Sequence, residues 1–494
     1  MGDSVDVVVI GAGNAAFSAA LSAREKGASV LMLERAPKEE ANGNSRFTAG
    51  SMRFAYEGID DLRALMPELT DEEIASTDFG SYPAGRYRHD MNRLNEHRSD
   101  ADLVEILVTR SKSTLLWMRE KGLRFVPAYA SQSIRKNGKV KFWGGSTVEV
   151  SGGGTGLVDA WTRAAERESI PILYGARAES LLHSNAGVHG VRARVNGRTT
   201  EIKASCLVLA AGGFEANAKW RARHLGAGWQ LAKVRGTRYN TGDGIRMGLE
   251  AGAVPYGRWS GCHAVGWDRN APQYGDLVVG NRFQKHSYPF GITINALGER
   301  FVDEGSEFRN YTYANYGRAV LNQPGRFAWQ IFDGKTLHLL RDEYRINRVT
   351  KVAAASLMEL VTKLEGVDAE RALQTIYQYN AAVQIGVPFD PSTEDGRATT
   401  GLIVSKSNWS TTIDTPPFEA YAVTCGITFT YGGLRINTAA EVLDRDLEPI
   451  RGLYAAGELV GGLFHFNYPG GSGLTAGAVF GRIAGASAAR AAGR

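Results

Sequence analysis

The first residues of the chain contain the feature that most limits its fold: an apolar strand, a glycine turn, a helix of small residues and a second apolar strand. Residues 7–10 are uniformly apolar, as expected for a parallel strand that is buried on both faces. The pattern Gly-x-Gly-x-x-Ala follows at residues 11–16 and opens a helix rich in alanine. This order predicts a βαβ unit, and hence an α/β protein with a mostly parallel sheet.

The small residues of this turn have distinct physical roles. Gly11 allows the tight turn, Gly13 lets the backbone approach a pyrophosphate, and Ala16 permits close packing of the helix on the strand. Glu34 ends the second strand 21 residues after Gly13, where a carboxylate can accept hydrogen bonds from ribose hydroxyls. Together with the positive end of the helix, these residues predict a Rossmann-like dinucleotide site. The alternative is a glycine turn that only packs a core helix.

Further glycine clusters indicate which dinucleotide is bound. A nicotinamide-binding domain is complete within about 150 residues and has no need of later glycine returns. The 59 glycines of this chain fall beside apolar runs, which favours close approaches of the backbone to a ligand over a linker. Four later clusters lie at residues 43–51, 151–161, 206–217 and 452–462.

Composition and charge exclude several classes of protein. At 494 residues, with 43% hydrophobic and 22% charged residues, the chain is long enough for two globular domains. Its net charge of +5 is mild and evenly spread, which argues against a nucleic-acid partner. A small anionic organic substrate is compatible with this charge.

The cysteines and the first residues bear on the compartment. Cys206, Cys262 and Cys425 stand far apart without a CxxC pair, so no iron–sulfur cluster, other metal site or disulfide framework is expected. The first residues are acidic and enter a strand at once, and no apolar run is long enough to span a bilayer. We therefore expect no signal peptide, no membrane span and a reducing, cytoplasmic compartment.

Seven motifs in order resemble the flavoprotein family of fumarate reductase and succinate dehydrogenase. They are GAGNAAFSAA, GNSRFTAG, LAAGGFEAN, TGDGIRMGLEAGA, GITINALGERFVDE, DTPPFEAYAV and GLYAAGELVGG. The resemblance covers nearly the whole chain and implies an α/β, Rossmann-like FAD-binding domain of the glutathione-reductase type. An α+β capping domain would interrupt it, with the active site between them. The FAD-binding domain would comprise residues 1–244 and 401–494, and the capping domain residues 245–400.

The resemblance also implies roles in holding FAD. Gly11, Gly13 and Glu34 would bind the ADP half. Asn44 and Ser45 match the segment that passes the isoalloxazine ring, although GNSRF alone is also compatible with a capped turn. Membrane-bound relatives have a covalently attached histidine at the position of Asn44, so we expect non-covalent FAD. Glu458 matches a residue beside the ribityl chain, and the other expected contacts are Ala16, Gly50, Gly153, Gly154, Ala211, Gly212, Asp243, Gly473 and Leu474.

Two longer segments give secondary-structure expectations. Residues 262–291 are predicted to be a loop with short strands, and residues 354–386 two amphipathic helices separated by a Gly-Val-Asp turn. From Leu474 a small-residue helix is expected through Ala489. In the family that helix points its N-terminus at the flavin pyrimidine, where a positive end stabilises the reduced anion.

Family members add or remove hydrogen across a carbon–carbon bond beside an electron-withdrawing group, so we looked for groups that bind a carboxylate or carry a proton. His263 matches a histidine that binds a substrate carboxylate, although an isolated histidine is more often structural. Arg309 lies one residue beyond the family position of a proton-donating arginine, and a surface pairing with Glu307 is the alternative. These two residues, with Tyr468, are the predicted catalytic groups.

The chain also departs from the dicarboxylate reductases. Their pattern has a carboxylate-clamping arginine where this chain has Asn467, Tyr468 and Pro469. A histidine pair is replaced by Thr428 and Phe429, and a Thr-Glu pair by Phe283 and Gln284. The loss of these anchors argues against fumarate or succinate as the substrate.

Two groups of relatives share the Tyr-Pro-Gly run. The chain looks most like tricarballylate dehydrogenases, which pass electrons to a separate membrane partner. It is also similar to 3-ketosteroid Δ1-dehydrogenases, in which the tyrosine before Pro-Gly hydrogen-bonds a ketone and promotes its enolisation, and a second catalytic tyrosine follows the FVDE-like motif. Tyr311 or Tyr313 could serve that second role here. Basic residues favour the carboxylate: Arg235, Arg238, His263, Arg282, Lys285, His286 and Arg309.

The sequence therefore predicts an FAD-dependent enzyme that acts on a CH–CH bond of a small polycarboxylate, such as tricarballylate, which it would oxidise to cis-aconitate. Its electrons would pass to a separate membrane-associated or soluble acceptor. The alternatives are a ketosteroid dehydrogenase and a flavin electron carrier without a substrate of its own.

Overall fold

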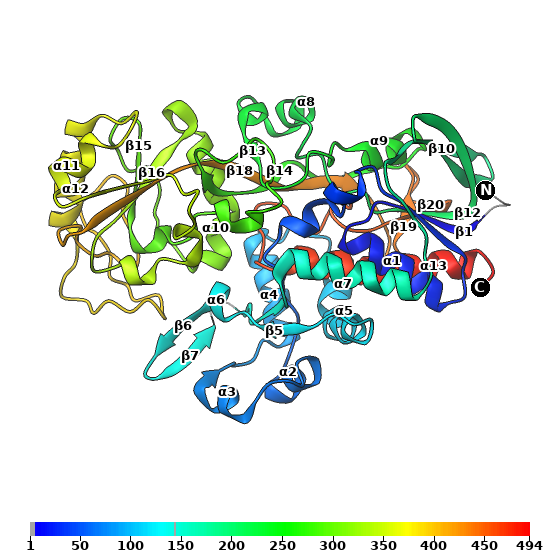
Figure 1. The fold of residues 1–494 in the computed structure, drawn as a ribbon, viewed down its shortest axis with the longest axis horizontal. Coiled ribbons are helices and arrows are strands. Elements are labelled where there is room, and N and C mark those ends of the chain that lie inside the picture. The colour runs from blue at the N-terminus through cyan, green and yellow to red at the C-terminus, as the bar shows by residue number, and fades with distance from the viewer. Residues whose placement is uncertain (1–4, 143–144) are drawn as a thin grey trace.

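The computed structural model describes residues 5–142 and 145–494 and shows a mixed α/β fold with two large sheets (Figure 1). The first sheet, near both ends of the described chain, has eight strands. The second, at the other end of the elongated molecule, has six. Among the helices of the described residues, none combines the length and apolar character needed to cross a bilayer.

The centre of the first sheet is parallel, as the glycine turn predicts. Its order is β20-β12-β1-β2-β9, and an antiparallel hairpin, β10-β11, extends from the N-terminal half of β12. The strands are β1 (Val5–Ile10), β2 (Val30–Leu33), β9 (Ile172–Leu173), β10 (Ala176–Ser184), β11 (Gly187–Val195), β12 (Arg198–Leu209), β19 (Glu441–Leu443) and β20 (Pro449–Ala455).

Helices α1 (Asn14–Glu25) and α13 (Ser472–Ala491) pack closely against each other beside this sheet (Figure 1). Their approach depends on glycine, because a Cβ at Gly481 would lie 2.4 Å from the carbonyl oxygen of Ala15, and one at Gly485 2.0 Å from that of Ala19. The small-residue helix predicted near the C-terminus is therefore confirmed, and its composition is explained by contact with α1.

The rest of this half of the molecule consists of helices and two small sheets. Strands β3, β8 and β5 form one small sheet, and β4, β7 and β6 the other. The elements are α2 (Ile59–Leu65), α3 (Asp71–Ser76), α4 (Ala84–Leu94), α5 (Ala101–Glu120), α6 (Tyr129–Gln132), α7 (Gly153–Arg167), α8 (Ala218–Trp220), α9 (Asp243–Glu250), β3 (Ser51–Met52), β4 (Thr77–Asp78), β5 (Phe125–Pro127), β6 (Ser133–Lys136), β7 (Lys139–Phe142) and β8 (Val148–Val150).

The second sheet is built around β18, a strand of 17 residues. Two of its neighbouring helices, α11 and α12, are the predicted amphipathic pair, and Asp368 of the Gly-Val-Asp turn caps α12 by accepting a hydrogen bond from the Arg371 amide at 2.9 Å. The elements are β13 (Lys233–Val234), β14 (Pro255–Asp268), β15 (Ile292–Asn295), β16 (Ala328–Phe332), β17 (Lys351–Ala354), β18 (Phe418–Leu434), α10 (Arg309–Leu321), α11 (Leu357–Thr362) and α12 (Ala369–Ala382).

Two strands connect the halves of the molecule. Strand β18 contributes Ala420 and Ala422 to the core of the second sheet and Tyr431 and Leu434 to the core of the first, and β14 pairs with it in antiparallel register (Figure 1). The prediction that residues 262–268 form a loop with short strands is therefore wrong. These residues are buried throughout, so the strand has no alternation of polar and apolar residues by which it could be recognised.

Candidate active site

A cavity of about 400 Å³ runs from the glycine turn of the first sheet to helix α10 of the second half. At one end it is lined by Gly11, Gly13 and Glu34, and at the other by His263 and Arg309. Its walls come from both halves of the molecule, which brings together motifs that are several hundred residues apart in the sequence.

The glycine turn leaves an open anion site. Gly11 has φ +118°, and a Cβ there would lie 2.3 Å from the carbonyl oxygen of Ala210. Gly13 is the N-cap residue of helix α1 and has no side chain to cap it, and the first turn of α1 contains no acidic residue. The first amide, that of Asn14, is bound by the neutral Ser45 hydroxyl at 2.9 Å. The positive end of α1 therefore faces the cavity without a protein anion, which fits a pyrophosphate.

Glu34 lies at the end of β2, where the sequence predicts a ribose contact. Its carboxylate is 7% exposed, lines the cavity and accepts a hydrogen bond from the Ala36 amide at 2.8 Å, while burial raises its pKa. Asp243, another predicted cofactor contact, also lines the cavity. The Asp243 carboxylate forms an ion pair with Arg35 Nη1 at 2.8 Å. Asp243 therefore also holds Arg35, the residue after Glu34, at this end of the site.

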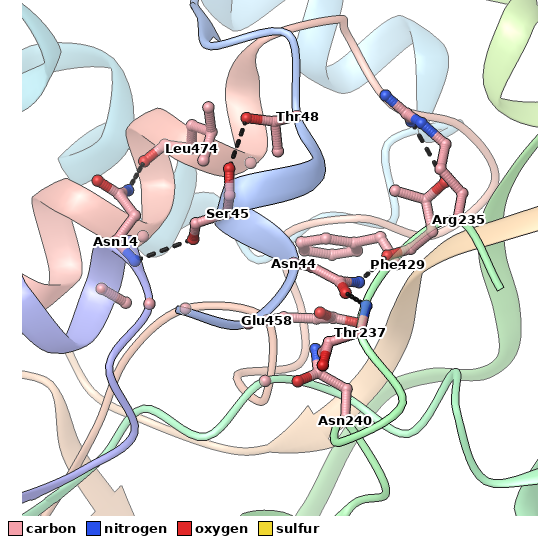
Figure 2. Close-up of a pocket in the computed structure, with 18 of the residues that line it drawn as sticks. Asn14, Asn44, Ser45, Thr48, Arg235, Thr237, Asn240, Phe429, Glu458 and Leu474 are labelled. Carbon is pink, nitrogen blue, oxygen red and sulfur yellow. Dashed lines mark hydrogen bonds between the residues drawn. The ribbon is translucent and has the colours of Figure 1, made fainter. Parts of the chain in front are cut away.

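Asn44 fastens the predicted flavin segment to both halves of the molecule. Its Nδ2 donates to Glu215 Oε1 at 2.5 Å and to the Thr428 carbonyl oxygen at 2.8 Å. Its Oδ1 accepts from the Thr237 amide at 2.9 Å (Figure 2). Ser45 accepts a hydrogen bond from the backbone amide of Asn14 at 2.9 Å (Figure 2). The loop is therefore held between α1, β18 and the segment after β13.

Two buried glutamates lie behind this loop. Glu458 lines the cavity, and its Oε1 accepts hydrogen bonds from the Thr430 amide at 2.8 Å and the Thr430 hydroxyl at 3.1 Å. Glu215 accepts a further bond from Asn240 at 2.7 Å. Burial and the neighbouring Glu458 carboxylate raise the pKa of Glu215, and burial raises the pKa of Glu458, so this arrangement favours a proton shared by the pair.

The glutamate pair predicts a pH-dependent stability. Because this pair binds protons more tightly in the folded state than in the unfolded state, its contribution to stability is fully present below about pH 4.3 and is lost as the pH rises through the raised folded pKa values. A difference of one between folded and unfolded pKa corresponds to about 1.4 kcal/mol. We expect Glu215→Gln, whose amide can replace the protonated carboxyl, to make the free energy of unfolding less dependent on pH.

Urea unfolding of the holoenzyme across pH 5–8 checks this expectation. Glu201→Gln, a substitution on the exposed face of β12, is the matched control and should retain the wild-type slope. A Glu215→Gln variant with the same slope as wild type would show that the pair does not share a proton.

The N-terminus of helix α13 forms another wall. Gly473 and Leu474 line the cavity, and the Leu474 carbonyl oxygen accepts a hydrogen bond from Asn14 Nδ2 at 2.7 Å (Figure 2). The Tyr468 hydroxyl accepts a hydrogen bond from the Gly473 amide at 2.8 Å, and burial raises the pKa of Tyr468. Ala211 and Gly212, after β12, also line the cavity as predicted.

Four predicted cofactor contacts lie outside the cavity. Ala16 is fully buried within α1. A Cβ at Gly154 would lie 2.5 Å from the Ser45 carbonyl oxygen, and one at Gly50 2.8 Å from the Cα of Gly153. These residues let α7 press against the loop that carries Asn44, so they shape the cavity wall from behind.

At the other end of the cavity, Arg309 begins helix α10 and is 8% exposed. Its Nη2 donates to Gln132 Oε1 at 2.8 Å, and its Nη1 lies 3.4 Å from His286 Nδ1. Burial, and next the positive charge of Arg341, lower the pKa of Arg309 to about 9. A surface pairing with Glu307 is excluded, because Glu307 binds Arg93 at 2.7 Å.

His263 lies in strand β14 and is 3% exposed. Its ring centroid is 4.9 Å from that of Tyr313 and 5.0 Å from that of Tyr468. Burial and the charge of Arg235 hold the pKa of His263 well below its usual range, so the ring is neutral. Its Nε2 has no hydrogen-bond partner among the residues that the structure describes.

The two candidate tyrosines of α10 point in different directions. Tyr313 is one helical turn after Arg309 and lines the cavity, as the i, i+4 spacing requires. The Tyr311 hydroxyl instead donates to Asp90 Oδ2 at 2.8 Å, and Asn467 donates to the Tyr311 carbonyl oxygen. Of these two, Tyr313 alone reaches the substrate end of the cavity.

The basic residues of the predicted cleft divide into two groups. Arg238 is 60% exposed and lies 3.7 Å from Glu40, while Lys285 is buried 3.8 Å from Asp268, and neither lines the cavity. Arg235, Arg282, His263, His286 and Arg309 do line it. The sequence reasoning missed Gln132, Arg341 and Glu343, which also line it; they lie outside the seven motifs, and only the tertiary fold brings them to Arg309.

Within residues 5–142 and 145–494, no group of three or more His, Cys, Asp or Glu side chains is arranged to hold a metal ion. The cavity does fit FAD, since it offers an elongated space, a glycine cradle, a buried carboxylate at the ribose position and two helix N-termini. The donors of the glycine turn suit a pyrophosphate, and those of α13 suit the flavin.

Comparison with known proteins agrees with this geometry. A family model described as FAD binding domain matches residues 6–474. A probable fumarate reductase of Shewanella frigidimarina (strain NCIMB 400) is 28% identical over 498 residues, covering 99% of this chain and 75% of that protein. The NADH:acrylate oxidoreductase of Vibrio harveyi is 29% identical over 552 residues, covering 98% of this chain and 50% of that protein.

Solved structures of flavoproteins also resemble this fold. The open conformation of a flavocytochrome c3 fumarate reductase superposes with a TM-score of 0.74 at 26% identity, covering 99% of this chain and 79% of that one. The 3-ketosteroid Δ1-dehydrogenase of Sterolibacterium denitrificans has a TM-score of 0.75 at 22% identity, covering 99% and 100%, and shows a shared fold alone. The predicted cofactor, FAD, is confirmed. The chain belongs to the FAD binding domain family, within the flavoprotein superfamily of fumarate reductase and succinate dehydrogenase, and is an FAD-dependent oxidoreductase.

Proposed function

We propose that this enzyme oxidises or reduces a carbon–carbon bond beside a carboxylate in a small polycarboxylate, with tricarballylate and cis-aconitate as the specific candidates. The observation that carries the proposal is Arg309, a buried arginine with a lowered pKa at the end of a cavity that continues to the dinucleotide turn. Relatives named as a probable fumarate reductase, an NADH:acrylate oxidoreductase and a urocanate reductase support a carbon–carbon bond beside a carboxylate, and the fumarate name alone supports more than one carboxylate.

We assign the first sheet to a Rossmann-like FAD-binding domain and the second to a capping domain. Ile245 and Met247 of α9 pack in the first core, whereas Ile413 and Phe418 pack in the second. The capping domain would therefore begin after about residue 254 and end within β18, which moves both of the boundaries expected from the sequence. FAD would be bound non-covalently, because Asn44 has no nucleophile for a flavin bond.

Charge favours a carboxylate over a ketosteroid. Arg235, Arg309 and Arg341 line the substrate end of the cavity with the exposed Arg282. Arg341 lies 3.7 Å from Glu343, and Asp342 also lines this wall, so the arginines there outnumber the acids. Buried cations of this kind need anionic partners, and a polycarboxylate supplies them. The aromatic part of the wall, formed by Tyr313, Phe429 and Tyr468, is too limited for a steroid ring system.

The protein residues would divide the work between binding and proton transfer. FAD, when bound, accepts or supplies the hydride. His263 and Arg235 would hold a substrate carboxylate, and Tyr468 would fix the plane of the carbon skeleton. Arg309, which begins α10, would give a proton to the neighbouring carbon in reduction and remove it in oxidation.

The pKa of Arg309 predicts opposite pH profiles for the two directions. In reduction Arg309 must be protonated, so kcat is expected to fall as the pH rises through about 9. In oxidation the neutral form is needed, and kcat should rise over the same range. After burial, the groups that set this pKa are Arg341, Glu343, Tyr313 and Tyr288. Gln132 and His286 also contact the guanidinium, so the groups that face Arg309 come from four segments.

Initial rates at saturating substrate between pH 6 and 10 check this profile. A kcat that does not change through about pH 9 would assign the proton to a group other than Arg309.

Electrons would be exchanged with a separate partner, soluble or membrane-associated. Relatives named as fumarate reductase (cytochrome) and as NADH:acrylate oxidoreductase support such an exchange. A carrier without its own substrate is the competing function.

Dye-linked turnover distinguishes these functions. We expect oxidation of tricarballylate or reduction of cis-aconitate with an artificial electron dye, and no turnover of a 3-ketosteroid. Turnover of the ketosteroid alone would assign the enzyme to the steroid class. Exchange of electrons with the dye but with no organic substrate would favour a carrier.

A further inference from the structure

His286 is a cavity residue that the catalytic assignment above leaves without a role. It follows the buried Lys285 in the sequence and is 3% exposed. It lines both the main cavity and a neighbouring cavity of about 20 Å³ behind Arg309. No regular helix or strand contains it. Its ring orientation is therefore set by side-chain contacts, and these determine which nitrogen it presents to a ligand.

Arg309 fixes the tautomer of His286. A guanidinium group has donors only, so the contact of 3.4 Å between Arg309 Nη1 and His286 Nδ1 requires Nδ1 to accept. In a neutral imidazole the proton then lies on Nε2, which becomes a hydrogen-bond donor. Burial, and next the charge of Arg309, hold the pKa of His286 well below its usual range, so the neutral form persists at physiological pH.

The Nε2–H group of His286 has no acceptor. It is buried and without a hydrogen-bond partner among the residues that the structure describes. A buried donor left unpaired is destabilising, because it has lost its hydrogen bonds to water without replacing them. The small rear cavity is lined mainly by Pro289, Phe290 and Trp409, together with Phe308 and Pro391, so it offers few polar partners.

Tyr313 lies between the two unpaired imidazoles. Its ring is edge-on to His263 at 4.9 Å and to His286 at 5.2 Å, which fixes the planes of both rings. Both histidines line the main cavity, and the Nε2 of each lacks a partner among the described residues. Two buried imidazoles, each with an Nε2 free to bind a ligand, therefore flank one aromatic ring, which suits a ligand with at least two oxygen atoms.

We propose that His286 is a specificity-determining residue, whose Nε2–H group binds an oxygen of a second substrate carboxylate while His263 binds the first. This inference rests on the proposed function and narrows it, because a monocarboxylate would leave one of the two imidazoles without an acceptor. Arg309 would connect proton transfer with substrate recognition. It would carry the proton to or from the substrate carbon, and its contact with His286 Nδ1 would keep the His286 proton on Nε2, where it can bind the substrate.

Two substitutions separate these tasks. An asparagine at position 286 places its amide near the former Nδ1 and can still accept from Arg309, whereas a glutamine reaches the former Nε2 and can still donate to the substrate. Loss of one hydrogen bond of about 1–1.5 kcal/mol corresponds to a change of about 5- to 12-fold in affinity. We expect His286→Asn to weaken polycarboxylate binding by that factor with kcat little changed, and His286→Gln to retain affinity and lose kcat.

Binding is measured by the perturbation of the flavin spectrum on anaerobic addition of cis-aconitate to the oxidised holoenzyme, and kcat by dye-linked turnover. His224→Asn is the matched control, because His224 lies in an aromatic cluster with Phe214, Trp220 and Trp259 and does not line the cavity. Its affinity and kcat should equal those of wild type.

Nitrogen-15 NMR of the unmodified holoenzyme gives a second test that does not depend on a variant folding. We expect the His286 resonance, identified because it is missing from both His286 variants, to show a protonated Nε2. This resonance should shift when cis-aconitate binds. Wild-type affinity in His286→Asn, or a His286 resonance that does not move on binding, would overturn the inference. Failure of the wild-type enzyme to bind any polycarboxylate would instead overturn the proposed function.

Discussion

Replacement of Arg309 by glutamine is expected to lower kcat by about 10²- to 10⁴-fold, the range that a general acid or base contributes. The FAD content should not change, because Arg309 lies at the end of the cavity remote from the glycine turn. Glutamine keeps a polar side chain but cannot carry the proton. The measurement is steady-state turnover of the variant at saturating substrate, with the flavin-to-protein ratio as the check on cofactor binding.

Arg348→Gln is the matched control for this substitution. Arg348 is an exposed arginine paired with Asp276 at 2.6 Å, outside the cavity, and its variant should keep wild-type kcat. If Arg309→Gln retained kcat within a few-fold, the proton would have to be carried by another group. Tyr313, which lies one turn further along α10, would then be the residue to change next.

Replacement of Gly13 by alanine is expected to weaken FAD binding by about 100-fold, or about 3 kcal/mol, without unfolding the protein. Its φ of −86° suits any residue, and a Cβ would lie 3.3 Å from Ser45 Oγ, a contact that small shifts can relieve. The added methyl group would nevertheless stand where the backbone must approach a pyrophosphate. Gly11 is unsuitable for this test, because a Cβ there would collide with Ala210.

Gly85→Ala is the control for this substitution. Gly85 lies in α4, where a Cβ would meet no atom within 4 Å, so the variant should bind FAD as the wild type does. Flavin fluorescence gives the affinity and circular dichroism of the apoprotein gives the fold. A Gly13→Ala variant with wild-type affinity would contradict the placement of the pyrophosphate at this turn.

The cofactor half of the site could be predicted because its signals are local. The run of residues 7–10, the spacing of Gly11 and Gly13 and the position of Glu34 all follow from the geometry of one βαβ unit. The structure places these residues together as expected. Ala16 and Gly154 show the limit of this reasoning, since a small residue can be needed for packing behind a cavity wall as much as for contact with a ligand.

The substrate half could be predicted only in part, because distant segments meet there. Arg309 and Gln132 are 177 residues apart and form a hydrogen bond, and no periodicity connects them. Arg341 and Glu343 are unremarkable charged residues until the fold brings them to Arg309. The choice between Tyr311 and Tyr313 depended on where α10 begins, and its start at Arg309 puts Tyr313 on the same helical face.

The central claim, a flavin enzyme with a cationic site for a small polycarboxylate, is tested most directly by anaerobic titration of the oxidised holoenzyme with tricarballylate. The visible absorbance of the oxidised flavin should bleach in proportion to added substrate, and Arg309→Gln should show no bleaching over the same time. Bleaching by a 3-ketosteroid but by no polycarboxylate would contradict a site for a small polycarboxylate.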